Sequence, residues 1–486
     1  MAFIHVTING TEGESMKLIT RHYINGEFVE SHGRETFDLI NPSTQELIGR
    51  VTLGDEEDTR RAIAAAKEAF KAYSKSAPEE RAEYLQRLHD ALVARAGEHA
   101  QALIQEYGGP SQMAHFLIQV AAGAILSAKK ALNEVEFKKM VGHTEVSLQP
   151  VGVAGHITPW NANILYFFNK ASAALAAGCT VVTKPSEMSA LQTQLIMECV
   201  HEAKIPAGLI NIVNGRGDVV GAEITRNPDV AKISFTGSTA VGKTIARDGA
   251  ATLKRVTLEL GGKSPHIILE DANLEQVIPF VLSSGFMNSG QACIAGTRVL
   301  VPESRAGEIK AALKQAVEQH LKVGLPQDAS TAIGPMVSKS QYERVQSYIN
   351  KGIAEGAEVL VGGPGHPAGL ESGNFVKPTL FANVTNDMTV AREEIFGPVL
   401  CLITYKVEQE AIAIANDTPY GLAGYVSGSD YDHAKRIADQ IEAGTVSINA
   451  FNNNPAAPFG GFKQSGLGRE NGVYGIHSYM EYKSIS

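Results

Sequence analysis

Apolar residues recur along the chain at two spacings, one typical of strands and one typical of helices. Residues 17–54 have the short alternating runs of strands and turns, and HYINGEFV places an Asn-Gly hairpin signal between two apolar strands. From residue 58, Ile63, Ala66 and Phe70 fall at helical spacing, and residues 78–103 repeat that spacing with leucines. We predict that both segments are helices that cover a sheet.

A strand-helix alternation begins at Val151. The predicted strands VGVAGHI, TVVTK, LINIV and KISF are separated by helical segments. That order predicts a parallel sheet with right-handed crossovers, and such sheets bind ligands where their strands end. The loops after Ile157, Lys184, Val213 and Phe235 are therefore the predicted ligand-binding positions.

The alternation resumes at Arg255 with RVTLEL, HIILE and TRVLV and with further helical segments, which predicts a second α/β unit. Before Val151, the polar stretch 127–150 ends in alternating residues, as a strand pair would, and we predict an arm there. A chain of 486 residues is long enough for two or three such units. The predicted fold class is α/β.

Composition and charge narrow the range of partners. Hydrophobic residues make up 44% and charged residues 20%, which is typical of globular proteins. With 43 Lys and Arg against 52 Asp and Glu, the net charge of −9 gives no electrostatic reason to expect nucleic acid or an anionic membrane. The two longest uncharged stretches, 146–169 and 276–297, are interrupted by polar residues, so we expect no membrane span in either.

The N-terminal segment and the cysteines indicate the compartment. The N-terminus has no charged region followed by a long apolar core and a cleavage site, so we expect no export signal, and residues 1–15 should form a loose extension. Four widely spaced cysteines, without a C-x-x-C pair or a histidine cluster, fit a reducing cytosol better than a disulfide framework or a zinc site. We expect a cytoplasmic protein without a metal site.

The stretch FMNSGQACI, residues 286–294, carries the cysteine whose surroundings best fit a reactive thiol. A thiol must lose its proton to attack a carbonyl, and Gly290 with polar Asn288, Ser289 and Gln291 would let backbone N–H groups approach it. Cys293 is therefore the candidate nucleophile. An isolated cysteine is more often a small buried hydrophobe, so the rest of the chain must decide between the two roles.

Two glycine-rich stretches could hold phosphate groups. Residues 237–244, GSTAVGKT, fit the P-loop pattern after a strand, with Lys243 and Thr244 at the phosphates and HIILED as a candidate second nucleotide motif. Residues 215–221, GRGDVVG, come within one residue of the dinucleotide pattern. Both stretches could aim backbone N–H groups at an anion, so a nucleoside triphosphatase and a dinucleotide-binding protein are both open at this point.

Five further motifs accompany Cys293. HITPWN and KPSE end two predicted strands, VTLELGGKSP follows, and EEIFGPV and PFGGFKQSGLGRE come later in the chain. Together with Cys293 they resemble the aldehyde dehydrogenase superfamily from about residue 20 to the C-terminus. The resemblance implies a Rossmann-like NAD-binding domain (16–127 and 151–260), a catalytic α/β domain (261–458), and a small β bridging arm (128–150 and 471–486) in a homodimer or homotetramer.

The resemblance also implies roles for five catalytic residues. Cys293 is the thiolate that adds to an aldehyde carbon, and Asn161 with the Cys293 backbone N–H forms the oxyanion hole. Glu259 is the general base for hydrolysis of the thioester, which favours a free carboxylic acid over transfer to coenzyme A. Lys170 and Glu470 match a pair sometimes assigned to proton relay, although an ordinary surface role fits them equally well.

The implied cofactor is NAD. Glu187, at the end of the second predicted strand, can accept hydrogen bonds from both ribose hydroxyls and would repel a 2′-phosphate, although it could instead be an acid that complements a helix N-terminus. The full set of implied cofactor contacts is Ile157, Thr158, Pro159, Trp160, Lys184, Ser186, Glu187, Gly217, Phe235, Gly237, Ser238, Leu260, Glu394 and Phe396.

The substrate tunnel should differ from that of many relatives, because Ala162 and Asn163 replace a bulky residue and a proline after the motif asparagine. The expected lining is Ala162, Tyr166, Asn169, Met287, Ile294, Phe451, Asn453 and Phe459. It is mostly apolar and has no Arg or Lys for a substrate carboxylate, which favours an uncharged aliphatic or aromatic aldehyde over a semialdehyde acid. A protein that kept the fold but lost the chemistry is the non-enzymatic alternative, and the intact Cys293, Glu259 and Asn161 argue against it.

Overall fold

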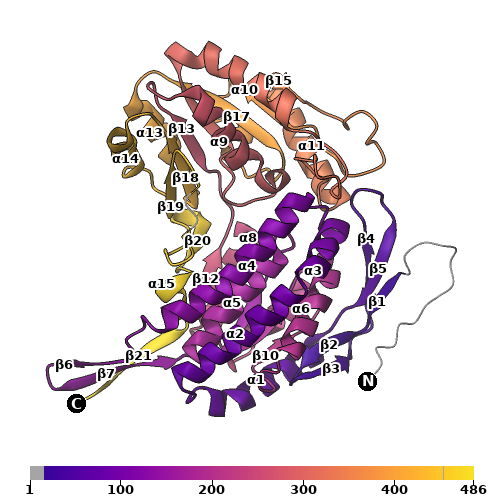
Figure 1. The fold of residues 1–486 in the computed structure, drawn as a ribbon, viewed down its shortest axis with the longest axis vertical. Coiled ribbons are helices and arrows are strands. Elements are labelled where there is room, and N and C mark those ends of the chain that lie inside the picture. Colours follow the sequence, from indigo (N-terminus) through magenta and orange to yellow (C-terminus); the bar gives the residue numbers. More distant parts are fainter. Residues whose placement is uncertain (1–15, 452–453) are drawn as a thin grey trace.

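The computed structural model describes residues 16–451 and 454–486. They form two α/β units, one above the other in Figure 1, and a narrow arm that projects from the lower unit. The predicted α/β class is confirmed. The expected loose extension, residues 1–15, lies outside the described residues.

The first unit is built on an eight-stranded sheet. Its strand order is β20 (Gly466–Leu467), β12 (Arg255–Glu259), β11 (Val230–Thr236), β8 (Val153–Ile157), β9 (Thr180–Lys184), β10 (Ile210–Ile212), β2 (Arg21–Ile24) and β3 (Glu27–Glu30). The five central strands from β12 to β10 are parallel, as the strand-helix alternation predicted. The β2–β3 hairpin is also confirmed, with Asn25 and Gly26 both at positive φ, as a tight Asn-Gly turn requires.

Helices cover both faces of this sheet. One face packs on α1 (Glu56–Tyr73), α7 (Ala222–Arg226) and α8 (Thr239–Gly249). The other packs on α2 (Pro78–Ala94), α3 (Ala96–Ala102), α4 (Ser111–Leu132), α5 (Asn163–Ala177) and α6 (Ala190–Glu202). The leucine-bearing segment 78–103 is therefore helical as predicted, except that Leu103 begins a π-helical turn, η1 (Leu103–Tyr107).

Helix α4 is the one described helix that is long and apolar enough to cross a membrane by length and composition. Its buried stripe, which includes Leu117, Ala121 and Ile125, packs against the helices and sheet of the first unit, and this packing accounts for its apolar character. The two uncharged stretches singled out in the sequence do not form continuous helices. They contain parts of β7 (Thr144–Pro150), α5 and α9 (Leu274–Phe286), the whole of β8, and loops.

The second unit is built on a seven-stranded sheet. The order is β15 (Glu358–Val361), β16 (Thr379–Ala382), β17 (Val399–Tyr405), β14 (Arg298–Pro302), β13 (Pro265–Ile268), β18 (Ala423–Ser427) and β19 (Thr445–Ile448), and only β15 is antiparallel. Around it lie α9, α10 (Ala306–His320), α11 (Lys339–Ala354), α12 (Thr389–Arg392), α13 (Glu408–Asn416) and α14 (Tyr431–Ala438). The strand of RVTLEL, β12, belongs to the first sheet, and the strand of HIILE, β13, belongs to the second. The second α/β unit therefore begins after β12 and not at Arg255.

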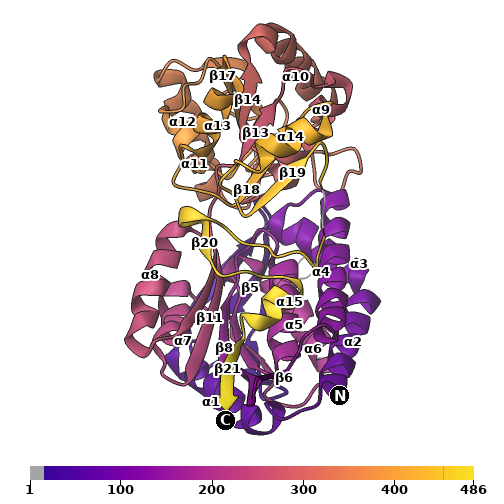
Figure 2. The same ribbon diagram turned by 90° about the vertical axis from the view of Figure 1, so that its left-hand side faces the viewer.

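The arm is a three-stranded sheet of β6 (Lys138–Val141), β7 and the C-terminal β21 (Met480–Ile485). Its predicted start at residue 128 is too early, because Ala128, Ala131 and Leu132 continue the buried stripe of α4. A smaller sheet, β1 (Lys17–Ile19), β5 (Leu47–Thr52) and β4 (Thr36–Ile40), flanks the first unit. Figure 2 shows the C-terminal segment descending from the second unit across the first, through β20 and α15 (Gly472–His477), into the arm.

Candidate active site

The loop that carries Cys293 has an unusual backbone. After α9, Asn288, Ser289 and Gly290 have φ values of 52°, 58° and 73°, so three consecutive residues lie in the left-handed region. A Cβ on Gly290 would come within 2.2 Å of the Gly397 carbonyl carbon. Gly290 is therefore required both by its conformation and by close contact with the EEIFGPV motif.

Gln291 and Ser289, the polar neighbours of Cys293, bind other segments of the chain through their side chains, a role that the sequence did not predict. The Gln291 amide donates to the Tyr107 hydroxyl (3.2 Å) and the Pro335 carbonyl (3.3 Å), and its oxygen accepts from the Val337 N–H (3.0 Å). The Ser289 hydroxyl accepts from the Gly334 N–H at 2.9 Å. These side chains anchor the loop to its surroundings, and that anchoring holds the strained backbone in place.

Cys293 is partly exposed, whereas Cys179, Cys199 and Cys401 are buried, and all four are free thiols. The Tyr166 hydroxyl lies 3.9 Å from the Cys293 sulfur. Burial, and then the nearby Glu394 carboxyl, raise the pKa of the Cys293 thiol to about 12. The raised pKa favours the protonated thiol in this conformation over the thiolate that an attack on a carbonyl requires.

Asn161 lies beside the cysteine loop. It follows β8, it is buried, and its side-chain amide donates to the Gln291 carbonyl at 3.0 Å. The Asn288 amide in turn donates to the Asn161 carbonyl at 3.0 Å. Because an amide nitrogen carries two protons, Asn161 can keep this bond and still donate to an oxyanion.

Glu259 is the last residue of β12 and is only 2% exposed. Neither carboxyl oxygen has a hydrogen-bond partner among the described residues. Burial, and then the neighbouring Glu470 carboxylate, raise the pKa of Glu259 well above its ordinary value. The sequence alone could have read Glu259 as solvent-facing, but the fold buries it, and this burial favours the neutral form of the carboxyl.

Lys170 and Glu470 form a buried ion pair, with side chains 0% and 10% exposed. The Ser234 hydroxyl contacts both of them, at 3.0 Å from Lys170 Nζ and 3.1 Å from Glu470 Oε1. The Asn169 amide donates to Glu470 Oε2 at 3.1 Å. The surface role that fitted this pair equally well is therefore wrong, because both side chains are interior.

The implied cofactor contacts from the first unit lie where its parallel strands end. Lys184 Nζ donates to Glu187 Oε2 at 3.0 Å at the end of β9. Ser238 caps the N-terminus of α8, and no described atom lies within 4 Å of a Cβ built on Gly217. Ile157, Thr158, Pro159, Ser186, Phe235 and Gly237 occupy the adjoining strand ends and loops. The N-terminus of α8 fits a pyrophosphate, and Glu187, in the short turn that follows β9, fits a ribose diol.

Residues of both units meet at the cysteine. The Trp160 ring lies 5.5 Å from Phe396 and 5.8 Å from Tyr107. Glu394 Oε1 accepts from the Gly262 N–H at 3.0 Å, in the connection that begins at Leu260 and joins the two sheets. Burial raises the pKa of Glu394 to about 7, so this carboxyl gains or loses its proton near neutrality.

The P-loop interpretation does not fit the fold. The strand of HIILED is β13, which belongs to the second sheet, whereas the neighbours of β11 are β8 and β12. Lys243 Nζ donates to Gln464 Oε1 at 2.8 Å on the exposed face of α8. The two nucleotide motifs are therefore not adjacent, as a P-loop site would require.

The residues of the expected substrate lining come from several elements. The Phe451 ring lies 5.4 Å from Phe280 and 5.7 Å from Tyr425, and this aromatic cluster packs against Ile294. The backbones of Phe459 and Glu470 pair in an isolated antiparallel β-bridge. Tyr166 and Asn169 belong to α5, and Ala162 directly precedes that helix. Met287 lies in the turn before the cysteine. Asn453 lies outside the described residues.

Asn163 has a structural role. Its side chain accepts from the Thr158 hydroxyl at 3.0 Å and donates to Thr193 at 3.1 Å, which joins α5 to the strand end and to α6.

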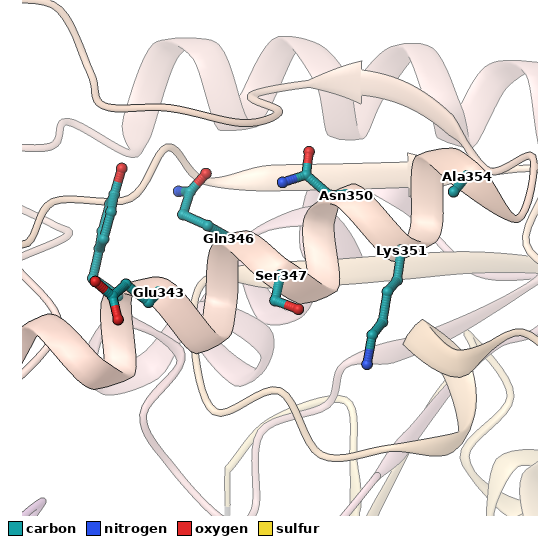
Figure 3. Close-up of a pocket in the computed structure, with 7 residues that line it drawn as sticks. Glu343, Gln346, Ser347, Asn350, Lys351 and Ala354 are labelled. Carbon is teal, nitrogen blue, oxygen red and sulfur yellow. The ribbon is translucent and has the colours of Figure 1, made fainter.

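An open groove of about 570 Å³ lies elsewhere, along α11 of the second unit (Figure 3). Its lining is Tyr342, Glu343, Gln346, Ser347, Asn350, Lys351 and Ala354, none of which is a predicted site residue. The groove is therefore separate from the cysteine site. Within residues 16–451 and 454–486, no group of three or more His, Cys, Asp or Glu side chains could hold a metal ion.

Comparison with known proteins places this geometry in context. The model of the aldehyde dehydrogenase family matches residues 28–485. A predicted aldehyde dehydrogenase of Staphylococcus epidermidis is 44% identical over 474 residues, 97% of this chain and 99% of that protein.

Solved structures are similar along nearly the whole chain. A mutant aldehyde dehydrogenase C of Pseudomonas syringae, in complex with NAD+ and octanal, is 43% identical with a TM-score of 0.94 and 96% coverage of both chains. The NAD+ complex of an aldehyde dehydrogenase from Bacillus cereus is 40% identical with a TM-score of 0.92, again with 96% coverage of both chains.

Proposed function

This chain belongs to the aldehyde dehydrogenase family, and we propose that Cys293 is the residue through which it oxidises an aldehyde with NAD. The observation that carries the proposal is the convergence on one thiol. The partly exposed Cys293 lies on a loop that Asn161 contacts from the first unit and Glu394 approaches from the second. The units 16–127 with 151–260 and 261–458 would thus supply cofactor binding and nucleophile respectively.

The described residues fit NAD. The Ser238 cap, the open position at Gly217 and the Lys184–Glu187 pair suit the pyrophosphate and a ribose, and Glu394 suits the second ribose. Bound NAD would supply the acceptor for the hydride that leaves the aldehyde carbon. Glu187 favours NAD over NADP, since its carboxylate would repel a 2′-phosphate.

The first chemical step belongs to Cys293 and Asn161. The sulfur adds to the aldehyde carbon, and the former carbonyl oxygen takes up negative charge as the thiohemiacetal forms. The Asn161 amide and the Cys293 backbone N–H are the donors for that oxygen. Because burial raises the pKa of the Cys293 thiol to about 12, the sulfur has to give up its proton to a base before it adds to the aldehyde.

The second step belongs to Glu259. Loss of hydride from the thiohemiacetal leaves a thioester on Cys293, and Glu259 takes a proton from the water that hydrolyses it. Because burial raises the pKa of the Glu259 carboxyl, the carboxyl has to be deprotonated before it can act as a base. Its presence favours a free carboxylic acid as product.

The substrate that best fits is an uncharged apolar aldehyde. The aromatic cluster of Phe280, Tyr425 and Phe451 beside Ile294 supports it, and so does the octanal bound by the Pseudomonas relative. A semialdehyde acid is the alternative, and the predicted lining offers no Arg or Lys to bind its carboxylate.

The arm supports assembly into a homodimer or homotetramer. Met140, Val141, Tyr482 and Ile485 are apolar or aromatic, lie on its strands and are more than half exposed. Exposed strand edges with apolar side chains favour pairing with a second chain. The free thiols fit the proposed cytoplasmic location.

A direct assay tests the function. We expect the protein, mixed with NAD and aldehydes of graded chain length and ring content, to produce reduced nicotinamide, and Cys293→Ala to abolish that signal. ATP hydrolysis measured in parallel should stay at background. Parental turnover in Cys293→Ala, or ATP hydrolysis without aldehyde oxidation, would overturn the assignment.

A further inference from the structure

A row of polar residues crosses four neighbouring strands of the first sheet. Strand register aligns Thr183, His156, Ser234 and Thr257 on β9, β8, β11 and β12, and all four are buried. Residues two apart on a strand share a face, so Thr257 lies on the same face as Glu259. This is the face that packs on α5, the helix that carries Lys170.

Ser234 has a defined donor and acceptor arrangement. A lysine ammonium has protons and no lone pair, so Lys170 Nζ donates to the Ser234 oxygen at 3.0 Å. The Ser234 hydroxyl proton is then free to be donated to Glu470 Oε1 at 3.1 Å. The serine therefore bridges the two members of the ion pair, and both its donor and one acceptor site are used.

The bridge completes the coordination of Glu470. Lys170 and Ser234 donate to one carboxyl oxygen, and Asn169 donates to the other at 3.1 Å. These three donors, which come from α5 and β11, fix a carboxylate that belongs to the C-terminal segment. Backbone contacts bring Glu470 close to Glu259. Glu470 pairs with Phe459 in an isolated β-bridge, and a Cβ built on the next residue, Gly460, would lie 2.9 Å from Glu259 Oε1. The Glu470 carboxylate is also one cause of the raised Glu259 pKa.

The C-terminal segment is held again at Tyr479. The Tyr479 hydroxyl lies 3.0 Å from His156 Nε2, and the Tyr479 carbonyl accepts from the Val151 N–H at 3.0 Å. Lys232 Nζ lies 4.7 Å from the Tyr479 ring centre and donates to Thr257 at 2.6 Å. The segment 470–479 is thus held to the first unit at both ends, by Glu470 and by Tyr479. Ser234 contacts the Glu470 end, which is the end near Glu259.

We propose that Ser234 is a positioning residue for thioester hydrolysis, which holds Glu470 and Lys170 in place beside Glu259. The inference rests on the proposed role of Glu259. Ser234 acts on the hydrolytic step alone, because addition of Cys293 to the aldehyde depends on Asn161 and on the cysteine loop.

The test separates the two chemical steps in the full-length enzyme. We expect Ser234→Ala to keep the rate of the first turnover of nicotinamide reduction within about twofold and to lower the steady-state rate about tenfold, the usual effect of one lost hydrogen bond to a charged group. Ser234→Thr restores a hydroxyl and should recover most of the steady-state rate. Ser172→Ala is the matched control, because Ser172 is buried on the same helix as Lys170 and its hydroxyl has no partner among the described residues.

The measured rates of these variants either support or overturn the role of Ser234. Two results for Ser234→Ala overturn the inference. In one, the first-turnover rate and the steady-state rate fall by the same factor. In the other, the steady-state rate falls no further than it does in Ser172→Ala. Both results can be obtained even if Ser234→Thr does not fold. Glu259→Gln is measured beside it. If Glu259→Gln cycles at the parental rate, the proposed role of Glu259 fails first, and that failure is distinct from a failure confined to Ser234.

Discussion

The Tyr166 hydroxyl lies 3.9 Å from the Cys293 sulfur, although the two residues are 127 positions apart and belong to different units of the fold. Tyr166 comes from α5, which begins directly after the loop of Asn161, and Cys293 follows α9 of the second unit. The candidate active site is thus assembled between the two sheets. Its chemistry depends on the contact between the two units as well as on the residues themselves.

The first prediction concerns the ionisation of Cys293. With its pKa raised to about 12, the thiol is protonated at neutral pH, and the thiolate fraction rises about tenfold for each pH unit below that value. We expect the rate of alkylation of Cys293 by iodoacetamide in the free enzyme to rise throughout the range from pH 7 to pH 10 without levelling. Peptide mass spectrometry identifies the modified cysteine, and a plateau below pH 9 would contradict the pKa direction.

The second prediction concerns Glu259. Because burial raises the pKa of the Glu259 carboxyl, Glu259→Gln keeps the shape of the side chain in a site that disfavours charge, and we expect little change in the thermal unfolding midpoint. A first-turnover burst of reduced cofactor should remain, while the steady-state rate falls on the order of 100-fold or more, as for the loss of a general base. Stopped-flow and steady-state absorbance measure both quantities. A steady-state rate equal to that of the parent removes Glu259 from the mechanism.

The third prediction concerns cofactor choice. Glu187→Ala should weaken NAD binding about tenfold and weaken NADP binding less, because the change removes hydrogen bonds to the ribose and also the repulsion of a 2′-phosphate. Glu303→Ala is the matched control, since Glu303 is also the first residue of a short 3-10 helix but lies in the second unit. Titration with each cofactor gives the ratio of dissociation constants. An unchanged ratio in Glu187→Ala would leave only the helix N-terminal role for this acid.

The fourth prediction concerns the backbone of the cysteine loop. Gly290→Ala places a methyl group 2.2 Å from a backbone atom of Gly397 and in a left-handed conformation, so we expect a loss of about 3 kcal/mol or more in the free energy of unfolding. Gly307→Ala is the control, because the position is exposed on α10 and a Cβ there meets no described atom within 4 Å. Denaturant unfolding measures both variants. Equal stability of the two would show that the loop does not need this contact.

The fifth prediction concerns substrate size. Phe451→Ala removes one ring of the aromatic cluster beside Ile294, so we expect kcat/KM to fall about 10-fold to 100-fold for long aliphatic and aromatic aldehydes and much less for short ones. The measurement is a chain-length series under steady-state conditions. A uniform decrease across the series would place Phe451 outside the substrate path.

The sequence predicted the parallel sheet, the hairpin at Asn25 and Gly26, the end of β9 at Lys184 and the loop after β8 that carries Asn161, because these depend on local spacing and turn chemistry. It also led to a wrong position for the start of the arm. The residue types at Ala128 and Leu132 do not by themselves show where the helix ends. The helix continues through both residues because their side chains are buried in the core. The P-loop pattern at residues 237–244 was compatible with the sequence for a similar reason, since sheet membership is not encoded in any short motif.

What the sequence by itself determined was the set of chemical groups: a thiol in a glycine-bearing loop, a strand-end asparagine, and acids after two strands. Only the tertiary structure decided their state. Burial raises the pKa of the Glu259 carboxyl and of the Cys293 thiol, and Lys170 and Glu470 are paired in the interior with Ser234. The physical reason is that ionisation and hydrogen bonding depend on the solvent and charges around a group, and those are supplied by residues that are remote in sequence.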